Sequence, residues 1–293
     1  MLLLTGATGL VGSAVLGRLL AEDAEVRCLV RDPRRLGARR VRVQIALGDL
    51  TDPPSFRNAL RGVHTVVHLA ASIRDQPHGS IEELNGVATW RMVEAAERQG
   101  VERFVFFSAL GASTHHRTRA LRAKALAEQA VREAGVASIV FAPSIVYAPG
   151  DPWLTLLERL ALLPVMPVSG RGRAAFQPIW AEDVAGCVVA ALRAPGSGPR
   201  ERYELAGPET LSHTDIVRTL LRSLNRRRPL VHVPTPIVSR ALRLLERMGG
   251  ARVFATWDEA ELMETTMTSA RGAADAEALG VRPQRMAAVL GSA

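Results

Sequence analysis

The chain has 293 residues, enough for one large α/β domain with a smaller lobe, and its 47% hydrophobic and 23% charged residues are typical of a globular protein. Its two cysteines, Cys28 and Cys187, form no CxxC pair, which excludes a disulfide framework and a zinc motif. The apolar start ends at Thr5 without a basic segment before it, and no apolar run reaches the roughly 18 residues of a membrane-spanning helix. We therefore expect a soluble, cytoplasmic protein.

The net charge of +8 comes almost entirely from arginine, because Lys124 is the one lysine among 37 basic residues. Scattered arginines with few interleaved aromatic residues do not form the pattern of a nucleic-acid-binding protein. The arginines at 226–228, 240, 243 and 247 leave open a weak contact with an anionic membrane or a partner, although a solvated helix face is the simpler interpretation. We expect no nucleic-acid partner, no integral membrane segment, and a monomer or homodimer.

The first half of the sequence alternates short apolar runs with segments of helical periodicity. Strands are predicted at 1–4, 26–30, 41–46, 65–70, 103–107 and 137–141, and helices from residue 10, at 81–98 and at 121–133. Each predicted strand looks buried. This alternation predicts a doubly wound parallel sheet with helices on both faces, a Rossmann-type α/β fold.

Prolines and glycines divide the sequence after Pro143 into shorter pieces. Helices are predicted at 184–192, 214–224 and 236–248, and a strand at 203–205. We place a Rossmann core at residues 1–145. Residues 146–293 form a smaller, mixed C-terminal lobe that faces a substrate or partner and contributes in part to the core sheet.

A glycine-rich turn lies between the first strand and the first helix. Gly6, Gly9 and Gly12 form a GxxGxxG pattern, which lets backbone N–H groups at a helix start approach a pyrophosphate. A purely structural turn is the alternative. The pattern predicts an NAD(P)-binding turn made of Gly6, Thr8, Gly9, Leu10, Val11 and Gly12.

The residue after the second strand distinguishes the two nicotinamide dinucleotides. An Asp or Glu there binds the ribose 2′-hydroxyl of NAD, whereas Arg31 can pair with the 2′-phosphate of NADP, assisted by Arg34 and Arg35. NADP is therefore the expected cofactor. NAD is the alternative, because a shift of one residue would put Asp32 at this position.

Two further strand ends contribute to the predicted cofactor site. Asp49 and Leu50 follow the third strand, where the carboxylate would accept from the adenine amino group or, alternatively, cap a turn. Small residues end the fourth strand and would let the backbone run beside a dinucleotide, or simply pack closely: Leu69, Ala70 and Ala71.

Segments in order along most of the chain resemble the atypical and extended short-chain dehydrogenase/reductases. The branch is the one similar to the NAD(P)-binding accessory subunit of respiratory complex I and to NAD-dependent epimerases and dehydratases. The segments are TGATGLVG at 5–12, VRDP at 30–33, GDL at 48–50, HLAA at 68–71, FFSALGA at 106–112, AKALAE at 123–128, PSIVYAPGD at 143–151, FQPIWAEDVA at 176–185 and YELAGPE at 203–209.

The resemblance implies a catalytic serine, tyrosine and lysine, and Ser108 and Lys124 match the first and the third. Ala120 stands at the tyrosine position. A phenol there moves a proton at a carbonyl or alcohol as hydride is transferred, which alanine cannot do. Lys124 is also expected to bind the nicotinamide ribose, with a solvated helix lysine as the alternative. The segment expected beside the nicotinamide is Pro143, Ser144 and Ile145.

Three side chains could replace the missing phenol: Tyr147, His115 and His116, for which a packing tyrosine and exposed loop histidines are the simpler interpretations. No metal site is expected at the histidines, since no carboxylate or cysteine neighbours them at ligand spacing. Other polar residues have predicted structural roles. Asn85 bridges backbone segments, Asp183 anchors a helix, and Asp151 with Trp153 lines the cleft or begins a helix.

Three functions remain open. The first is an NADP-dependent oxidoreductase acting on an unidentified small hydrophobic carbonyl compound, with Ser108 polarising the substrate oxygen and the proton coming from water or a substitute residue. The second is a catalytically silent protein that senses NADP(H) or stabilises a partner complex. A sugar-nucleotide epimerase or dehydratase would need the same missing tyrosine and is the least favoured.

Overall fold

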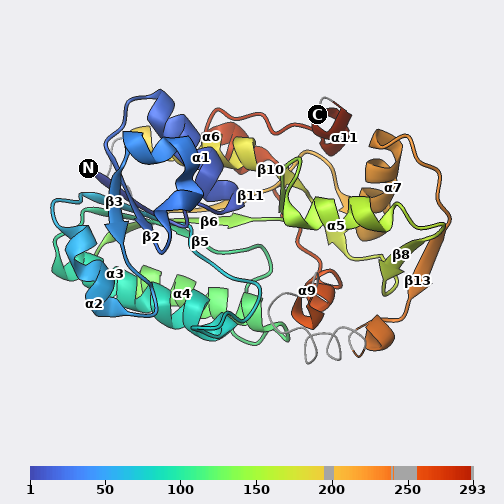
Figure 1. Ribbon diagram of the computed structural model, residues 1–293, viewed down its shortest axis with the longest axis horizontal. Helices are drawn as coiled ribbons and strands as arrows, with labels where there is room; N and C mark the ends of the chain where they lie inside the picture. Colours follow the sequence, from blue (N-terminus) through green and yellow to red (C-terminus); the bar gives the residue numbers. More distant parts are fainter. Residues whose placement is uncertain (195–200, 239, 241–255, 292–293) are drawn as a thin grey trace.

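The computed structural model describes residues 1–194, 201–238, 240 and 256–291. Within these residues a central sheet of seven parallel strands runs in the order β11-β6-β5-β4-β1-β2-β3 (Figure 1). The strands are β1 (Leu2–Thr5), β2 (Val26–Val30), β3 (Gln44–Leu47), β4 (Thr65–His68), β5 (Arg103–Phe107), β6 (Ala137–Pro143) and β11 (Glu201–Leu205). The predicted parallel Rossmann-type sheet is confirmed.

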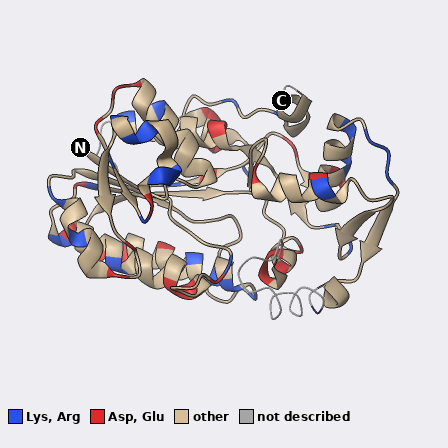
Figure 2. Ribbon diagram, viewed as in Figure 1, with Lys and Arg blue, Asp and Glu red and all other residues tan. Residues whose placement is uncertain are grey.

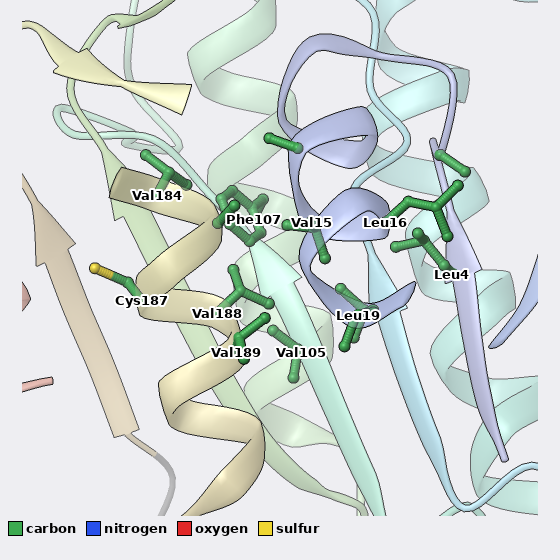
Figure 3. Close-up of a cluster of buried hydrophobic side chains, with 14 of the residues drawn as sticks. Leu4, Val15, Leu16, Leu19, Val105, Phe107, Val184, Cys187, Val188 and Val189 are labelled. Carbon is green, nitrogen blue, oxygen red and sulfur yellow. The ribbon is translucent and has the colours of Figure 1, made fainter. Parts of the chain in front are cut away.

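Helices cover both faces of this sheet. On one face α1 (Leu10–Ala21) and α6 (Ala181–Arg193) bury aliphatic side chains against β1 and β5, as Figure 3 shows for Val15, Val188 and Phe107. The other face is covered by α2 (Pro53–Arg57), α3 (Ala88–Arg98) and α4 (Arg119–Glu133). Burial on both faces explains why these strands have continuous apolar sequences.

The third strand differs from its prediction. β3 begins at Gln44, and residues 33–42 before it form short 3₁₀ turns. β3 pairs with β2 alone and forms the edge of the sheet, so that Ile45 and Leu47 are 41% and 63% exposed. The expectation of a buried strand at 41–46 was wrong, because an apolar run does not reveal whether the strand has a neighbour on each side.

The predicted helix over 81–98 is present, but a π-helical turn at Glu83–Val87 interrupts it before α3. A further 3₁₀ turn, Asn58–Leu60, follows α2. The π-helical turn at Glu83–Val87 is wider than an α-helical turn, and such turns are frequent at functional sites. Here it places Asn85, which is 1% exposed, beside the loop that follows β4.

We call the elements after residue 145, apart from β11 and α6, the C-terminal lobe; they supply most of a third apolar cluster, whereas β11 and α6 belong to the Rossmann core. Three two-stranded sheets pair β7 (Val146–Tyr147) with β10 (Ile179–Trp180), β8 (Met166–Ser169) with β13 (Leu230–Val233), and β9 (Ala175–Phe176) with β12 (Leu211–Ser212). Helices of the lobe that lie entirely within the described residues include α5 (Pro152–Leu160), α7 (His213–Ser223), α9 (Trp257–Leu262), α10 (Ala274–Ala278) and α11 (Met286–Gly291).

Most of the helix predicted at 236–248 lies outside the described residues, including Arg243 and Arg247. Among the helices that the structure describes, none combines the length and the apolar character needed to cross a membrane.

Candidate functional site

The order of the strands reverses between β1 and β4, and in open α/β sheets ligands bind at the carboxyl ends of the strands at such a point. Gly6 follows β1 with φ of +73°, and a Cβ on it would lie 2.6 Å from the backbone nitrogen of Ala70. A Cβ on Gly12 would overlap the carbonyl oxygen of Gly6. Both positions need glycine, because backbone packs directly on backbone where the predicted turn meets the end of β4.

The start of α1 fits a bound pyrophosphate. Gly9 precedes the helix without a side-chain cap, and the first turn contains no acidic residue. The first N–H groups of a helix have no partner within it, and they favour a negative charge. The backbone N–H groups of Leu10 and Val11 are therefore available as donors at the start of α1, and Thr8 in the preceding turn is half-buried. This is the arrangement that the GxxGxxG pattern predicts.

At the end of β2, where the adenosine is expected, Arg31 and Asp32 have different partners. β2 ends at Val30, and Arg31 follows it as an exposed side chain with a nitrogen 3.9 Å from an oxygen of Asp49. The carboxylate of Asp32 accepts a hydrogen bond from the backbone nitrogen of Arg34 at 2.9 Å and caps the following turn. The structure thus brings Arg31 and Asp49 together, with Arg34 exposed nearby in the chain.

A chain of hydrogen bonds through buried His68 fixes the segment that follows β4. The backbone nitrogen of Ala70 donates to Oγ1 of Thr5 at 3.3 Å, and that hydroxyl lies 2.9 Å from Nδ1 of His68. Nε2 of His68 lies 3.1 Å from Oγ1 of Thr89, which donates to the carbonyl of Asn85 at 2.7 Å. Because Thr89 uses its proton there, Nε2 is the protonated ring nitrogen and Nδ1 accepts from Thr5.

His68 stays neutral in this position. Its complete burial, with a smaller contribution from the charge of Lys124, lowers the pKa of His68 to about 3. No role for His68 was predicted from the sequence. The available signal is a histidine at the end of an apolar strand, which needs polar partners when it is buried. Through the hydroxyl of Thr5, the neutral ring supports the backbone of Ala70 beside the glycine turn.

The side chain of Asn85 connects the loop after β4 to the helix that follows it. Its Oδ1 accepts from the backbone nitrogen of Ser72 at 3.1 Å. Its Nδ2 donates to the carbonyl oxygens of Ser72 and Ile81 at 2.6 and 2.8 Å. The predicted bridging role of Asn85 is confirmed.

Ser108 follows β5 directly, and Lys124 of α4 reaches the last residue of the same strand. The ammonium of Lys124 donates to the carbonyl of Phe107 at 2.5 Å and lies 5.0 Å from the centre of the Phe106 ring. Burial lowers the pKa of Lys124 to about 8. The alternative of a solvated helix lysine is therefore wrong. Ser108 is 4% exposed, and its hydroxyl has no hydrogen-bond partner within the described part of the chain.

No phenol takes part in this arrangement at the first turn of α4, where Ala120 stands. Tyr147 is fully buried in the lobe core, and burial raises the pKa of its phenol well above its usual value. Nδ1 of His116 lies 3.0 Å from the backbone nitrogen of Thr118, from which it accepts a hydrogen bond. His115 is exposed. A role for these three residues in place of the missing tyrosine stays a prediction.

The segment predicted beside the nicotinamide connects the two parts of the fold. The hydroxyl of Ser144 donates to the carbonyl of Met267 at 2.6 Å and accepts from the backbone nitrogen of Gln177 at 3.0 Å. The carbonyl of Pro143 accepts from Leu110 at 2.9 Å. The hydroxyl of Ser144 thus already has two hydrogen-bond partners within the protein. Ile145, the next residue, is half-buried.

Three other predicted residues also have structural partners. Asp151 accepts from the backbone nitrogen of Leu154 at 2.8 Å and caps α5, which supports the helix-start interpretation. Trp153 packs against the apolar core of the lobe. Asp183 accepts from the backbone nitrogen of Gln284 at 2.8 Å and so anchors α6 to the C-terminal segment.

Ion pairs that the sequence analysis missed join α9 of the lobe to the Rossmann core. Arg74, in the loop after β4, donates to both carboxylate oxygens of Glu259 at 2.6 and 3.0 Å. Arg119, the residue before Ala120, lies 3.6 Å from a carboxylate oxygen of Asp258. Arg74 and Glu259 are 185 positions apart, so no local pattern could have found this pair.

The comparisons with known proteins agree with this geometry. Residues 6–195 match the family model described as NAD(P)H-binding. The chain is 28% identical over 79% of its length to the mitochondrial NADH dehydrogenase [ubiquinone] 1 alpha subcomplex subunit 9 of Arabidopsis thaliana, and it spans 60% of that protein's length. It is 29% identical to the ceramide reductase of Caulobacter vibrioides, over 90% of this chain and 84% of that protein.

The fold is shared with a nucleoside-diphosphate-sugar epimerase from Staphylococcus aureus, whose solved structure superposes with a TM-score of 0.79 at 19% identity over 99% of both chains. This likeness concerns the fold. The glycine turn, the strand order and the family match together show that the chain belongs to the NAD(P)H-binding family, as an atypical short-chain dehydrogenase/reductase.

Proposed function

We propose that this protein is an NADP(H)-dependent reductase of a small hydrophobic carbonyl compound. The observation that carries the proposal is the buried hydroxyl of Ser108, which has no partner in the described chain, one residue beyond the carbonyl that holds Lys124. Leaving a buried polar group unpaired costs about 1–3 kcal/mol. A substrate oxygen that accepts from this hydroxyl would remove that cost.

Bound NADP(H) would supply a hydride to the carbonyl carbon and be oxidised in the process. Ser108 donates a hydrogen bond to the carbonyl oxygen, which polarises the bond. Lys124 would bind the ribose hydroxyls, and its positive charge favours the negative charge that develops on the substrate oxygen. The oxygen then takes a proton from water, because Ala120 offers none.

A hydrophobic substrate is supported by the apolar surroundings of this strand end. Leu110 and Ala142 are buried at the end of the lobe core, in the same cluster as Tyr147 and Met267. The ceramide reductase among the relatives is named for a lipid substrate. Both observations favour an apolar carbonyl compound over a sugar nucleotide.

A preference for NADP is supported by Arg31 at the end of β2 and by the engagement of Asp32 in its own turn. We expect NADPH to bind more tightly than NADH. Replacing Arg31→Asp should reverse this order, because a carboxylate accepts from the ribose hydroxyls and repels a 2′-phosphate. Dissociation constants of both nucleotides, measured by calorimetry for the two proteins, test this; tighter binding of NADH by the unchanged protein would contradict it.

The reaction is tested by following NADPH absorbance while a panel of aliphatic ketones, aldehydes and quinones is added to the purified chain. We expect oxidation with at least one apolar carbonyl compound. The Ser108→Ala variant should bind NADPH with unchanged affinity and lose most of this turnover. Turnover that is equal in the Ser108→Ala variant would remove the serine from the mechanism.

A catalytically silent NADP(H)-binding protein is the second candidate, and Ala120 is the observation that favours it. The Arabidopsis relative is named as a subunit of a larger complex, which is consistent with such a role. A silent protein would show a rise in thermal unfolding midpoint with NADPH but no oxidation with any member of the panel.

A further inference from the structure

The arginines are distributed unevenly between the two parts of the fold. Residues 159–181 and 216–240 contain nine arginines and no Asp or Glu. Since the whole chain has a net charge of +8, all remaining residues together have a net charge of −1. The positive excess of the protein therefore comes from these two stretches, both of which belong to the C-terminal lobe.

The two stretches meet at one end of the lobe, which we call the basic tip and define as residues 161–165 and 226–231. Arg226 and Arg228 both donate to the carbonyl oxygen of Ala161, at 3.2 and 3.3 Å. β8 and β13 begin side by side there (Figure 1). Figure 2 shows a blue stretch without red between α7 and β13, at the end of the molecule away from the N-terminus.

The basic tip also exposes consecutive apolar side chains. Leu162, Leu163 and Val165 are 62%, 45% and 40% exposed, and Val231 on the neighbouring strand is 44% exposed. Pro164 between them is exposed as well. Single exposed aliphatic residues are ordinary, but a group of them in one loop indicates a surface that contacts a partner.

The charges of the tip are not neutralised by carboxylates that the structure describes. Of the nine arginines, Arg218 alone forms an ion pair with a described residue, Asp215. Arg226 and Arg228 bond to carbonyl oxygens, which leaves their charge uncompensated, and Arg227 is exposed. The tip therefore attracts an anionic surface.

We propose that the basic tip docks the protein on an anionic lipid bilayer. Leu162 and Leu163 enter the boundary between headgroups and acyl chains, while the arginines at 226–228 contact lipid phosphates. Exposed aliphatic residues beside uncompensated arginines are the combination that interfacial binding requires. A nucleic acid offers phosphates without an apolar phase, and the tip has no aromatic residue that could stack on a base. The proposal is independent of the proposed reaction.

Sedimentation of the full chain with vesicles tests the proposal. We expect binding to phosphatidylcholine vesicles that contain phosphatidylglycerol, little binding to phosphatidylcholine alone, and weaker binding as salt increases. Replacing Arg226, Arg227 and Arg228 by Gln should weaken binding about fivefold for each arginine removed. The matched control replaces three exposed arginines of the Rossmann core by Gln: Arg40, Arg57 and Arg61.

Two further variants test whether a loss of vesicle binding comes from misfolding or from the change in charge alone. Arg227→Glu removes no hydrogen bond shown by the structure and should reduce binding strongly. Leu162→Ser with Leu163→Ser should reduce binding at unchanged charge, because less apolar surface enters the bilayer. Thermal unfolding midpoints show that each variant is folded.

Equal weakening by the tip and control triple variants would overturn the proposal, because binding would then follow net charge alone. Unchanged binding of the double serine variant would overturn the insertion of the loop. Binding to duplex DNA without binding to anionic vesicles would assign the tip to a different partner and would also overturn it.

Discussion

The candidate site has a phosphate end, at the glycine turn after β1, and a second end, at Ser108 after β5. The two ends differ in how completely their polar groups are hydrogen-bonded within the described chain. At the phosphate end, Gly6 and Gly12 pack against backbone, and the Thr5–His68–Thr89 chain satisfies the polar groups behind them. At the other end, Ser108 has a hydroxyl without a described partner, and Ala120 stands where the sequence resemblance implies a tyrosine. The two ends depend on residues of different strands and helices, so that variants can test them separately.

The largest effect is expected at the phosphate end, from Gly12→Val. A Cβ there overlaps the carbonyl oxygen of Gly6, so the turn cannot keep its shape, and NADPH affinity should fall by at least about 100-fold. Gly17→Ala in the same helix is the control, since its Cβ first meets the flexible side chain of Arg39 at 3.5 Å. That variant should bind normally and gain up to about 1 kcal/mol in unfolding free energy. If both variants lose NADPH affinity equally, any substitution in α1 reduces binding, and the shape of the turn is not the cause.

The end at Ser108 is probed by Ala120→Tyr, which introduces the phenol that the proposed reaction lacks, at the first turn of α4. A positioned general acid contributes about 100-fold or more to a rate, so kcat with a reducible carbonyl compound should rise by that order. Ala120→Phe supplies the same ring without the hydroxyl and should not increase kcat. If the Tyr variant binds NADPH but has the same kcat as the Phe variant, the absence of a phenol is not the only reason for a low rate.

His68, which lies behind the glycine turn, makes the unfolding free energy depend on pH. The pKa of His68 is about 3 in the folded protein and about 6.5 in the unfolded chain, so between these values the unfolded chain binds the additional proton. Unfolding free energy should therefore fall as pH decreases through this window, by up to about 1.4 kcal/mol per pH unit. In His68→Gln the slope should be smaller by this contribution, while the buried His213 still titrates. Identical slopes in urea titrations of both proteins would contradict the assignment.

The smallest effect is expected where the lobe closes on the core. Glu259→Gln weakens the paired hydrogen bonds with Arg74 and should lower the unfolding free energy by about 1 kcal/mol. Glu261→Gln in the same helix is the control, because its carboxylate forms no ion pair with a described residue. We expect the first variant alone to lower the thermal unfolding midpoint. Equal midpoints for both variants would remove this pair from the contacts that hold the lobe.

Local signals account for the parts of the fold that were predicted correctly and for the candidate site residues that were named. β2 and β5 have the predicted bounds, because each is an apolar run between turn residues. The glycine turn was found for the same reason, since its three glycines lie within seven residues. Lys124 became a candidate because it is a single lysine in an arginine-rich chain and stands four residues after Ala120; its role stays a prediction.

Contacts between distant segments account for what was missed. The exposure of β3 depends on the absence of a second neighbouring strand in the described sheet, which its own residues do not encode. The role of His68 depends on Thr5 and Thr89, which come from another strand and from α3. The docking of α9 depends on a pair 185 positions apart.

The sequence by itself determined the alternation of strands and helices, the glycine-rich turn after the first strand and the absence of tyrosine at position 120, because each depends on a few neighbouring residues. Only the tertiary structure decided that Asp32 caps a turn beside Arg31, that the ammonium of Lys124 is fixed on the carbonyl of Phe107, and that the basic tip gathers apolar residues from one stretch and arginines from another. Burial and hydrogen bonding arise when the chain packs, and packing joins residues that the sequence keeps apart.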